Sequence, residues 1–140
     1  MGGRRLEKTE LESILEESRI ARICCHNEDG TIHATPVWYK YMDGKIVFVT
    51  VDRSIKARNL KRNKNVTVLI DLVDPAVKGV MIYGTAELDY SDIFPMVLTI
   101  CEKYFEKKEK AKSFADMMVS ETGIDLIVRI KPERMITFHF

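Results

Sequence analysis

Cysteine is scarce in this sequence, and long apolar runs are missing from it. The three cysteines, Cys24, Cys25 and Cys101, form an odd set without the C-x-x-C spacing of a zinc knuckle, which favours a reducing compartment. The longest apolar runs are far shorter than the roughly 20 residues that cross a bilayer, and the first residues lack the apolar stretch of a secretory signal. We therefore expect a cytoplasmic protein without a membrane partner.

Neither sign of charge predominates. The 22 basic and 21 acidic side chains leave a formal net charge of +1. Such a balance creates no overall field that would attract nucleic acid or an anionic membrane. Any anion site must therefore be a local arrangement of a few side chains.

The common catalytic and nucleotide-binding motifs are also missing. The sequence contains no G-x-S-x-G, H-E-x-x-H, G-x-x-x-x-G-K-[ST] or G-x-G-x-x-G. Its histidines, His26, His33 and His139, could form a metal trio with Cys24 or Cys25, but they lack local ligand spacing. We expect no metal site.

What is present is a mostly β pattern with turn signals. At 140 residues and 46% hydrophobic content, without low-complexity runs, the chain fits one domain over residues 1–140. Strand patterns cover residues 19–26, 31–41, 45–50, 65–72, 80–90 and 124–140, the last kinked or interrupted at Pro132. Gly84 inside the fifth strand marks a bulge or a close approach. Short hairpins cannot join parallel strands, so an antiparallel barrel or sandwich is predicted.

Four helices are expected around these strands. The first covers residues 9–18, with Thr9 and Glu12 as a capping box. Ser54 is a plausible N-cap for a helix over 54–63. The other two cover 92–108, with Pro95 in the first turn, and 111–121.

Four residues between the third strand and the second helix have the chemistry of a phosphate site. A phosphate needs cationic donors, a hydroxyl and free backbone N–H groups at a helix start. Thr50, Arg53, Ser54 and Lys56 supply these groups. The alternative is a solvated basic helix with a capping serine, and spacing alone does not decide between them.

The second strand offers a surface for a flat ring. Its segment TPVWYKY places Pro36 and Trp38 beside each other, and apolar pockets with a few polar anchors hold cofactors in this way. Pro36 removes a ladder donor, which predicts an edge or a bulge. Trp38 can alternatively pack in the core, and we expect the backbone of Val37 to Tyr39 to matter more than the side chains.

In order, the segments TPVWY, IVFVT, RSIKARNLKRNKNVTVLI, GVMIYGTAEL and IKPERMITF resemble the pyridoxamine 5'-phosphate oxidase-like FMN-binding split-barrel superfamily over residues 9–140. The resemblance implies a mainly β fold with peripheral helices: a six-stranded antiparallel Greek-key split β-barrel. It further implies a homodimer that binds FMN in a cleft at the interface.

The resemblance also implies a set of cofactor contacts. From one subunit these are Thr35, Pro36, Val37, Trp38, Tyr39, Val49, Thr50, Arg53, Ser54, Lys56 and Asn59. From the second subunit come the segment 80–84, with Val80 and Met81, and the region of Glu133 and Arg134.

Three departures argue against pyridoxamine phosphate oxidase activity itself. True members of that enzyme group share an Arg-Lys pair on the phosphate helix, where this chain has Ile55 and Lys56. They also share a strand arginine, where this chain has Ala34, and a carboxy-terminal extension beyond the position of Phe140. The sequence is more similar to a small branch of the superfamily, some of whose members use the deazaflavin coenzyme or bind haem.

We therefore expect an FMN-binding flavoprotein, a flavin-dependent oxidoreductase of an unidentified small molecule. Flavin chemistry belongs to the cofactor, so no side-chain nucleophile is required. The alternatives are a deazaflavin-dependent reductase and a non-catalytic flavin or haem module that acts as sensor or carrier. Single-strand nucleic-acid binding, with a basic track at 56–65 and Trp38, Tyr39 and Tyr41 as stacking platforms, is disfavoured by the near-zero net charge.

Overall fold

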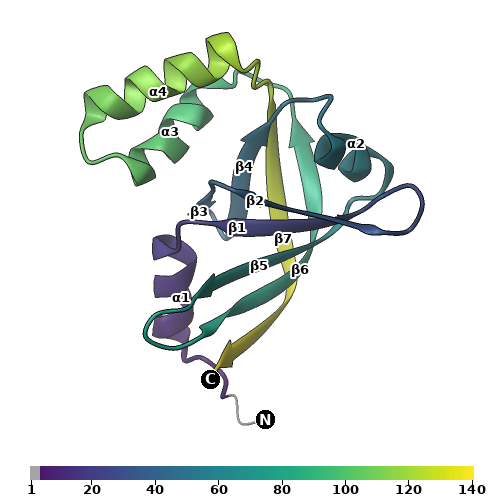
Figure 1. The fold of residues 1–140 in the computed structure, drawn as a ribbon, viewed down its shortest axis with the longest axis vertical. Coiled ribbons are helices and arrows are strands. Elements are labelled where there is room, and N and C mark those ends of the chain that lie inside the picture. Colours follow the sequence, from purple (N-terminus) through teal and green to yellow (C-terminus); the bar gives the residue numbers. More distant parts are fainter. Residues whose placement is uncertain (1–3) are drawn as a thin grey trace.

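The computed structural model describes residues 4–140 and shows a single antiparallel sheet with four helices (Figure 1). The strands are β1 (Ala21–His26), β2 (Ile32–Val37), β3 (Lys40–Met42), β4 (Lys45–Thr50), β5 (Asn65–Leu72), β6 (Lys78–Asp89) and β7 (Leu126–His139). The helices are α1 (Lys8–Glu17), α2 (Ile55–Arg62), α3 (Phe94–Tyr104) and α4 (Lys108–Glu121).

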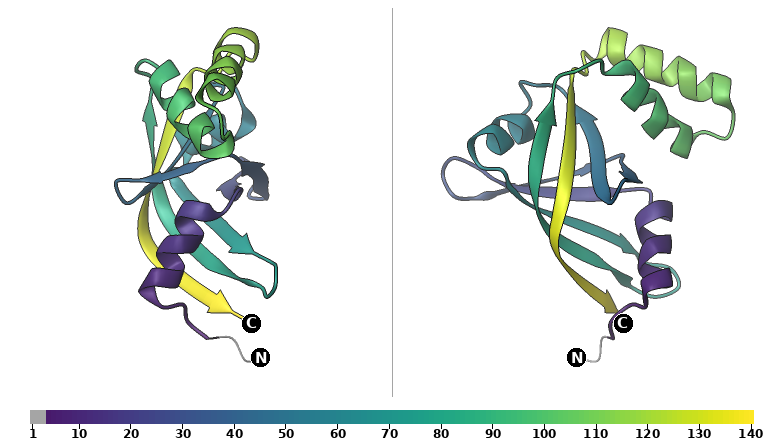
Figure 2. Two further views of the ribbon diagram at one scale, coloured as in Figure 1. Left: turned by 90° about the vertical axis from the view of Figure 1, so that its left-hand side faces the viewer. Right: turned by 180° about the vertical axis from the view of Figure 1, so that it is seen from behind.

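The sheet is curled into a half-barrel. Its strand order is β2-β1-β5-β6-β7-β4-β3, and each neighbouring pair is antiparallel. The two edge strands, β2 and β3, are consecutive in the chain and are joined by only Trp38 and Tyr39. The sheet therefore bends until its edges meet, and the β1–β2 hairpin crosses over β4 and β7 (Figures 1 and 2).

The core lies on the inner face of this curled sheet. Successive strand side chains point to opposite faces, so every second residue of β5 and β6 is buried. Helix α1 covers part of the core with Ile14 and Leu15, which are each 1% exposed. The helical pair α3–α4 lies at one end of the sheet, and the small apolar cluster of this pair packs against Val49 and Val51 at the end of β4 (Figure 2).

All four predicted helices are present, each within four residues of its predicted bounds, but one predicted cap is wrong. Ser54 is the N-cap of α2, and its Oγ accepts a hydrogen bond from the Ala57 N–H at 3.2 Å. Pro95 lies in the first turn of α3, as predicted. Helix α1, however, begins at Lys8, and its capping box is formed by Glu7 and Glu10 instead of Thr9 and Glu12.

The prediction of six strands is wrong because residues 31–41 form two strands. The chain leaves β2 after Val37 and crosses to the other edge of the sheet before β3 begins. At the crossing, the Tyr39 N–H donates to the Tyr104 hydroxyl at 3.0 Å, and the Tyr39 carbonyl accepts from Lys103 Nζ at 3.2 Å. These bonds to α3 replace strand pairing, so no continuous strand forms. Pro36 lies on an edge strand, as expected.

Gly84 lies at a bulge, which confirms its predicted role. The β6–β7 register shifts between Tyr83 and Gly84, and this shift lets β7 continue through Pro132 without the predicted interruption. A Cβ atom on Gly84 would overlap the backbone carbonyl oxygen of Lys131. Only a glycine lets the two strands approach this closely.

Replacing Gly84 with alanine should therefore destabilise the fold. We expect Gly84→Ala to lower the free energy of unfolding by about 1 to 3 kcal/mol, since backbone must move to admit the methyl group. Urea unfolding measures the loss, and Thr85→Ala on the same strand is the control, with a smaller expected effect. Equal stability of Gly84→Ala and the wild type would contradict the close approach.

Candidate functional site

The end of β4 and the start of α2 form a polar corner. The Thr50 hydroxyl donates to Ser54 Oγ at 3.1 Å, which ties the strand end to the helix cap. The first-turn N–H groups of Ile55 and Lys56 have no intrahelical partner, because the first turn of any helix lacks preceding carbonyls. The corner therefore combines a helix start, two hydroxyls and oriented backbone donors, the arrangement that favours an anion.

Two cationic side chains belong to the same corner. Arg53 is exposed and Lys56 is half-buried, and within residues 4–140 neither side chain forms a hydrogen bond or a salt bridge. Burial lowers the pKa of Lys56, and the nearby Cys25 partly offsets this effect. Lys61 of the same helix is instead paired with Asp52. A half-buried ammonium without a counter-ion is stabilised by any anion that reaches it.

The hydroxyl of Thr35 is buried without a partner. Thr35 is paired with the core residue Ile23, so its side chain lies on the inner face of the β1–β2 hairpin. Its Oγ1 makes no hydrogen bond within the described chain. Cys25, two residues along β1 on the same face, is near Lys56. Since buried hydroxyls are rarely left unbonded, Thr35 is well placed to bond a ligand that enters here.

Asn59 has a different position from the one expected of a cofactor contact. It is 4% exposed, and its Nδ2 donates to Asn27 Oδ1 at 2.9 Å. Its Oδ1 accepts from Arg62 at 2.9 Å. Both ends of the amide are thus engaged in holding α2 against the β1–β2 turn.

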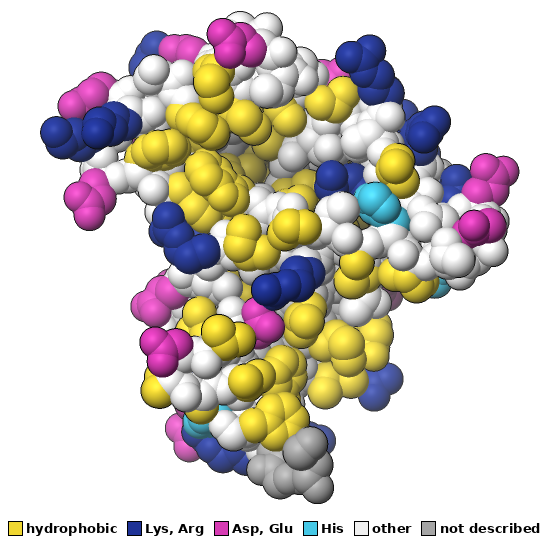
Figure 3. Space-filling view, viewed as in Figure 1, with side chains coloured by type: hydrophobic (Ala, Val, Ile, Leu, Met, Phe, Trp, Pro, Cys, Tyr) yellow, Lys and Arg dark blue, Asp and Glu magenta, His cyan; other side chains and the backbone are white. Residues whose placement is uncertain are grey.

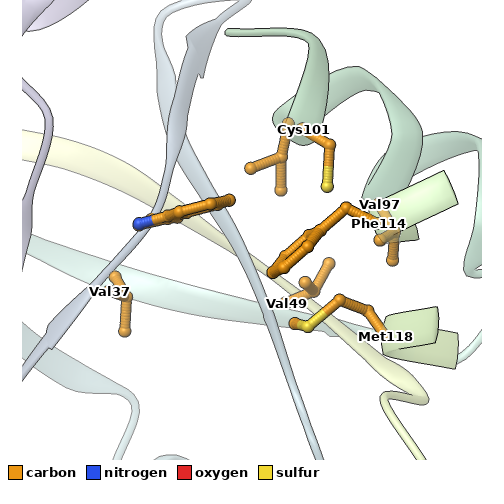
Figure 4. A pocket seen from close by; sticks show the side chains of 8 residues that line it. Val37, Val49, Val97, Cys101, Phe114 and Met118 are labelled. Atoms are coloured by element: carbon orange, nitrogen blue, oxygen red, sulfur yellow. The ribbon is translucent and has the colours of Figure 1, made fainter. Parts of the chain in front are cut away.

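An apolar cavity of about 250 Å³ lies between the sheet and the α3–α4 pair (Figures 3 and 4). It is lined by Val37, Trp38, Val49, Val97, Ile100, Cys101, Phe114 and Met118. Three of these, Val37, Trp38 and Val49, were predicted as cofactor contacts. The five helical residues were not, although the apolar positions of segments 92–108 and 111–121 were the available signal. Figure 3 shows the apolar hollow beneath the two helices.

Trp38 forms one wall of the cavity and is held by aromatic neighbours. Its ring stacks on Tyr104 with a centroid distance of 4.2 Å and an interplanar angle of 8°. The centroid of the Trp38 ring also lies 5.4 Å from that of Phe114 and 6.0 Å from that of Phe105. The side chain remains 37% exposed, so it is not an ordinary core residue.

Tyr39 and Lys103 support this wall from behind. The Tyr39 side chain is fully buried, and its hydroxyl donates to the Leu15 carbonyl at 2.6 Å, so the ring is not available for stacking on a nucleic-acid base. Lys103 Nζ lies 3.6 Å from the centre of the Tyr39 ring. Burial, with smaller contributions from Lys40 and Arg19, lowers the pKa of Lys103 to about 8.

The residues expected from a second subunit lie elsewhere on the chain. Val80 faces the core, whereas Met81 lies on the outer face of the sheet beside Leu69 and Ile136. A groove of about 360 Å³ on the sheet is lined by His26, Asn65, Val66, Thr67, Tyr83, Gly84 and Glu133. Neither Val80 nor Met81 lines the apolar cavity.

Two further features concern the part of the chain that the structure describes. No three histidine, cysteine, aspartate or glutamate side chains in residues 4–140 come together as a metal site. None of the helices there is both long and apolar enough to cross a membrane.

The structure thus combines a curled antiparallel sheet, a polar corner at the start of α2 and an apolar cavity beneath the α3–α4 pair. The chain belongs to the pyridoxamine 5'-phosphate oxidase family, whose sequence model matches residues 8–134. No curated protein matched the chain significantly.

Solved structures have the same fold. The conserved hypothetical protein Rv2991 of Mycobacterium tuberculosis is 26% identical, with a TM-score of 0.80, covering 95% of this chain and 84% of its own. An FAD-binding protein of Mesorhizobium loti is 20% identical, with a TM-score of 0.72, covering 100% and 99%. An F420 reductase is 19% identical, with a TM-score of 0.72, covering 94% and 98%.

The half-buried ammonium of Lys103 should make stability depend on pH in a defined direction. Its pKa is about 8 in the folded chain, against an ordinary value of 10.5. Between these values the unfolded chain binds a proton that the folded chain does not, so the contribution of Lys103 to stability increases with pH across this window.

Comparison with Lys103→Met isolates this effect from other titrating groups. The difference in free energy of unfolding, wild type minus variant, should increase as the pH is raised from about 8 to about 10.5. Urea unfolding at several pH values measures this difference. A difference that stays constant or decreases across the window would contradict the assigned pKa.

Proposed function

We propose that this protein binds FMN and is a flavin-dependent oxidoreductase of a small molecule. The observation that carries the proposal is a pair of groups without partners within residues 4–140, the half-buried Lys56 ammonium and the buried Thr35 hydroxyl, which lie on either side of Cys25. A phosphate and a polyol chain would satisfy both. The names of the FAD-binding relative and the F420 reductase support a cofactor of this class.

The described residues fit the parts of FMN in order. Arg53, Ser54, Lys56 and the first-turn N–H groups of α2 would hold the phosphate. Thr35 would bond the ribityl chain. The polar edge of the ring would find unpaired backbone groups along β2, which pairs with β1 on one side only.

The bound flavin would supply hydride or electron transfer, and the chain would supply orientation and shelter from water. Trp38, fixed against Tyr104, would limit the position of the ring. No ionisable side chain in the cavity is required to act as a nucleophile.

The deazaflavin coenzyme is the second candidate, favoured by the fold shared with the F420 reductase. It has a similar ring system and a phosphate group, so the same corner would hold it. Competition between FMN and the deazaflavin for one site would distinguish the two by affinity.

We further propose that two copies of the chain pair and complete the cofactor cleft. Leu69, Met81 and Ile136 stand side by side on three adjacent strands of the outer face, and Ile136 is 36% exposed. The next row contains Tyr83, which is 37% exposed, beneath the Arg134 guanidinium. A partly exposed apolar row of this kind is typical of an interaction surface.

Removal of the corner cations should weaken FMN binding. We expect Arg53→Ala and Lys56→Ala each to cost about 1.5 to 3 kcal/mol, roughly a 12- to 150-fold loss of affinity, because each removes a charge-assisted contact. Quenching of FMN fluorescence measures the dissociation constant. Arg58→Ala, which removes an exposed cation from the same helix, is the matched control and should bind FMN as the wild type does. Unchanged affinity in both corner variants would refute the phosphate assignment.

A charge on the outer face should separate the subunits and release the flavin. We expect Ile136→Lys to shift the protein to a monomer that holds FMN poorly, since the lysine would be buried at the interface. Sedimentation velocity, recorded at protein and flavin wavelengths, reports both properties together. Val73→Lys makes the same change at a loop residue that is 68% exposed and should leave the dimer intact. Stoichiometric FMN on a wild-type monomer would contradict the proposal.

A further inference from the structure

We infer that the apolar cavity between β2, β4 and the α3–α4 pair is the substrate pocket, and that it selects an uncharged aromatic molecule of about one ring. This inference rests on the proposed flavin site beside it and concerns what reacts there. The two sites share Val37, Trp38 and Val49, so a molecule in the cavity would lie next to the flavin.

The lining of the cavity excludes charged substrates. Its eight side chains are aliphatic, aromatic or sulfur-containing, and none carries a charge. The thiol of Cys101 is 3% exposed, and burial raises its pKa, so it remains neutral. A carboxylate or phosphate in this cavity would lose its hydration without gaining a partner, which costs far more than the apolar contacts return.

The half-buried ammonium of Lys103 does not change this conclusion. Lys103 Nζ donates to the Tyr39 carbonyl and contacts the Tyr39 ring. It is not among the residues that line the cavity. An anionic substrate in the cavity therefore cannot form an ion pair with Lys103.

The size and polarity of the cavity distinguish its occupant from the flavin. Its volume of about 250 Å³ is below the roughly 300 to 1,000 Å³ typical of sites for drug-sized ligands. The flavin ring has three fused rings and a polar edge whose carbonyl and N–H groups need hydrogen bonds when buried. The side chains that line the cavity offer almost no hydrogen-bonding groups, whereas the unpaired edge of β2 offers backbone groups. The cavity therefore suits a second, smaller and less polar molecule.

The cavity also has rigid aromatic walls. Tyr104 is held through its hydroxyl, whose single proton is shared between the carbonyls of Arg19, at 2.8 Å, and Tyr39, at 3.2 Å. Trp38 stacks on the Tyr104 ring. From α4, the Phe114 ring projects into the space between Cys101 and Val49 (Figure 4). Flat rings pack well against such surfaces, which are already ordered before a ligand enters.

The protein contains a single tryptophan, Trp38, and this residue lines the cavity. The one indole N–H signal in a proton–nitrogen NMR spectrum therefore reports occupancy directly. The probes are 4-nitrobenzyl alcohol and 4-nitrobenzoate, which share a ring and differ in charge. Each is titrated into the FMN-loaded protein, and the absorbance of protein-bound FMN is measured in parallel.

Two adjacent methionines of α4 provide matched variants. Met118 lines the cavity, whereas Met117 is 36% exposed and does not. Met118→Asp places a carboxylate against the cavity, and Met117→Asp makes the same change in the same helix outside it. The comparison of the two probes in the wild type needs no variant, so it holds even where Met118→Asp fails to fold.

We expect the alcohol to shift the indole signal saturably, with FMN still bound, and the benzoate to bind at least about tenfold more weakly. Met118→Asp should weaken binding of the alcohol by at least about tenfold, and Met117→Asp should not. Equal or tighter binding of the benzoate would overturn the inference. Displacement of FMN by the alcohol would also overturn it, because the cavity would then be the ring site, while flavin binding itself would stand. Selective binding of the alcohol by a protein that holds no FMN would support the cavity's preference and contradict the flavin proposal alone.

Discussion

The hydroxyl of Tyr104 holds the crossing on which the rest of the structure depends. Two residues carry the chain from one edge of the sheet to the other, and Tyr39 there has no strand partner for its backbone. The Tyr104 hydroxyl accepts from the Tyr39 N–H, and its single proton is shared between the carbonyls of Arg19 and Tyr39. Each such bond contributes about 0.5 to 1.5 kcal/mol. Together they close the half-barrel and fix α3 against it.

The same contact creates the cavity. Because α3 is held at the crossing, Trp38 stacks on Tyr104, and the α3–α4 pair lies over Val49 at the end of β4. The space left between them is apolar because each helix directs its own apolar face toward the sheet. The polar corner at the start of α2 is built independently, from the cap of a single helix and the strand that precedes it. The polar corner and the apolar cavity thus have separate structural causes.

Much of the fold and part of the site could be predicted because their causes are local. Ser54 caps a helix, Pro36 lies on an edge strand and Gly84 permits a bulge, and each follows from the chemistry of one residue. The split of residues 31–41 could not be predicted, since it depends on bonds between Tyr39 and a helix 65 residues away. The cap of α1 was misplaced because glutamate at position 7 serves where serine or threonine is usual.

The site was harder to predict for the same reason. The helical half of the cavity comes from segments whose apolar residues looked like ordinary packing positions. The burial of Tyr39 and the engaged amide of Asn59 arise from contacts with distant elements. The unpartnered hydroxyl of Thr35 can be recognised only once its neighbours are placed. Sequence reasoning therefore indicates which chemistry is available, and the long-range contacts decide which groups remain free to use it.

FMN binding can be checked in one measurement, the visible absorption spectrum of the purified protein. We expect the two visible bands of an oxidised flavin in the protein fraction, either as purified or after incubation with FMN and removal of the excess. A single near-ultraviolet band would indicate the deazaflavin, and a Soret band would indicate haem. A protein that remains colourless after incubation with FMN would contradict the proposal that the chain binds this cofactor.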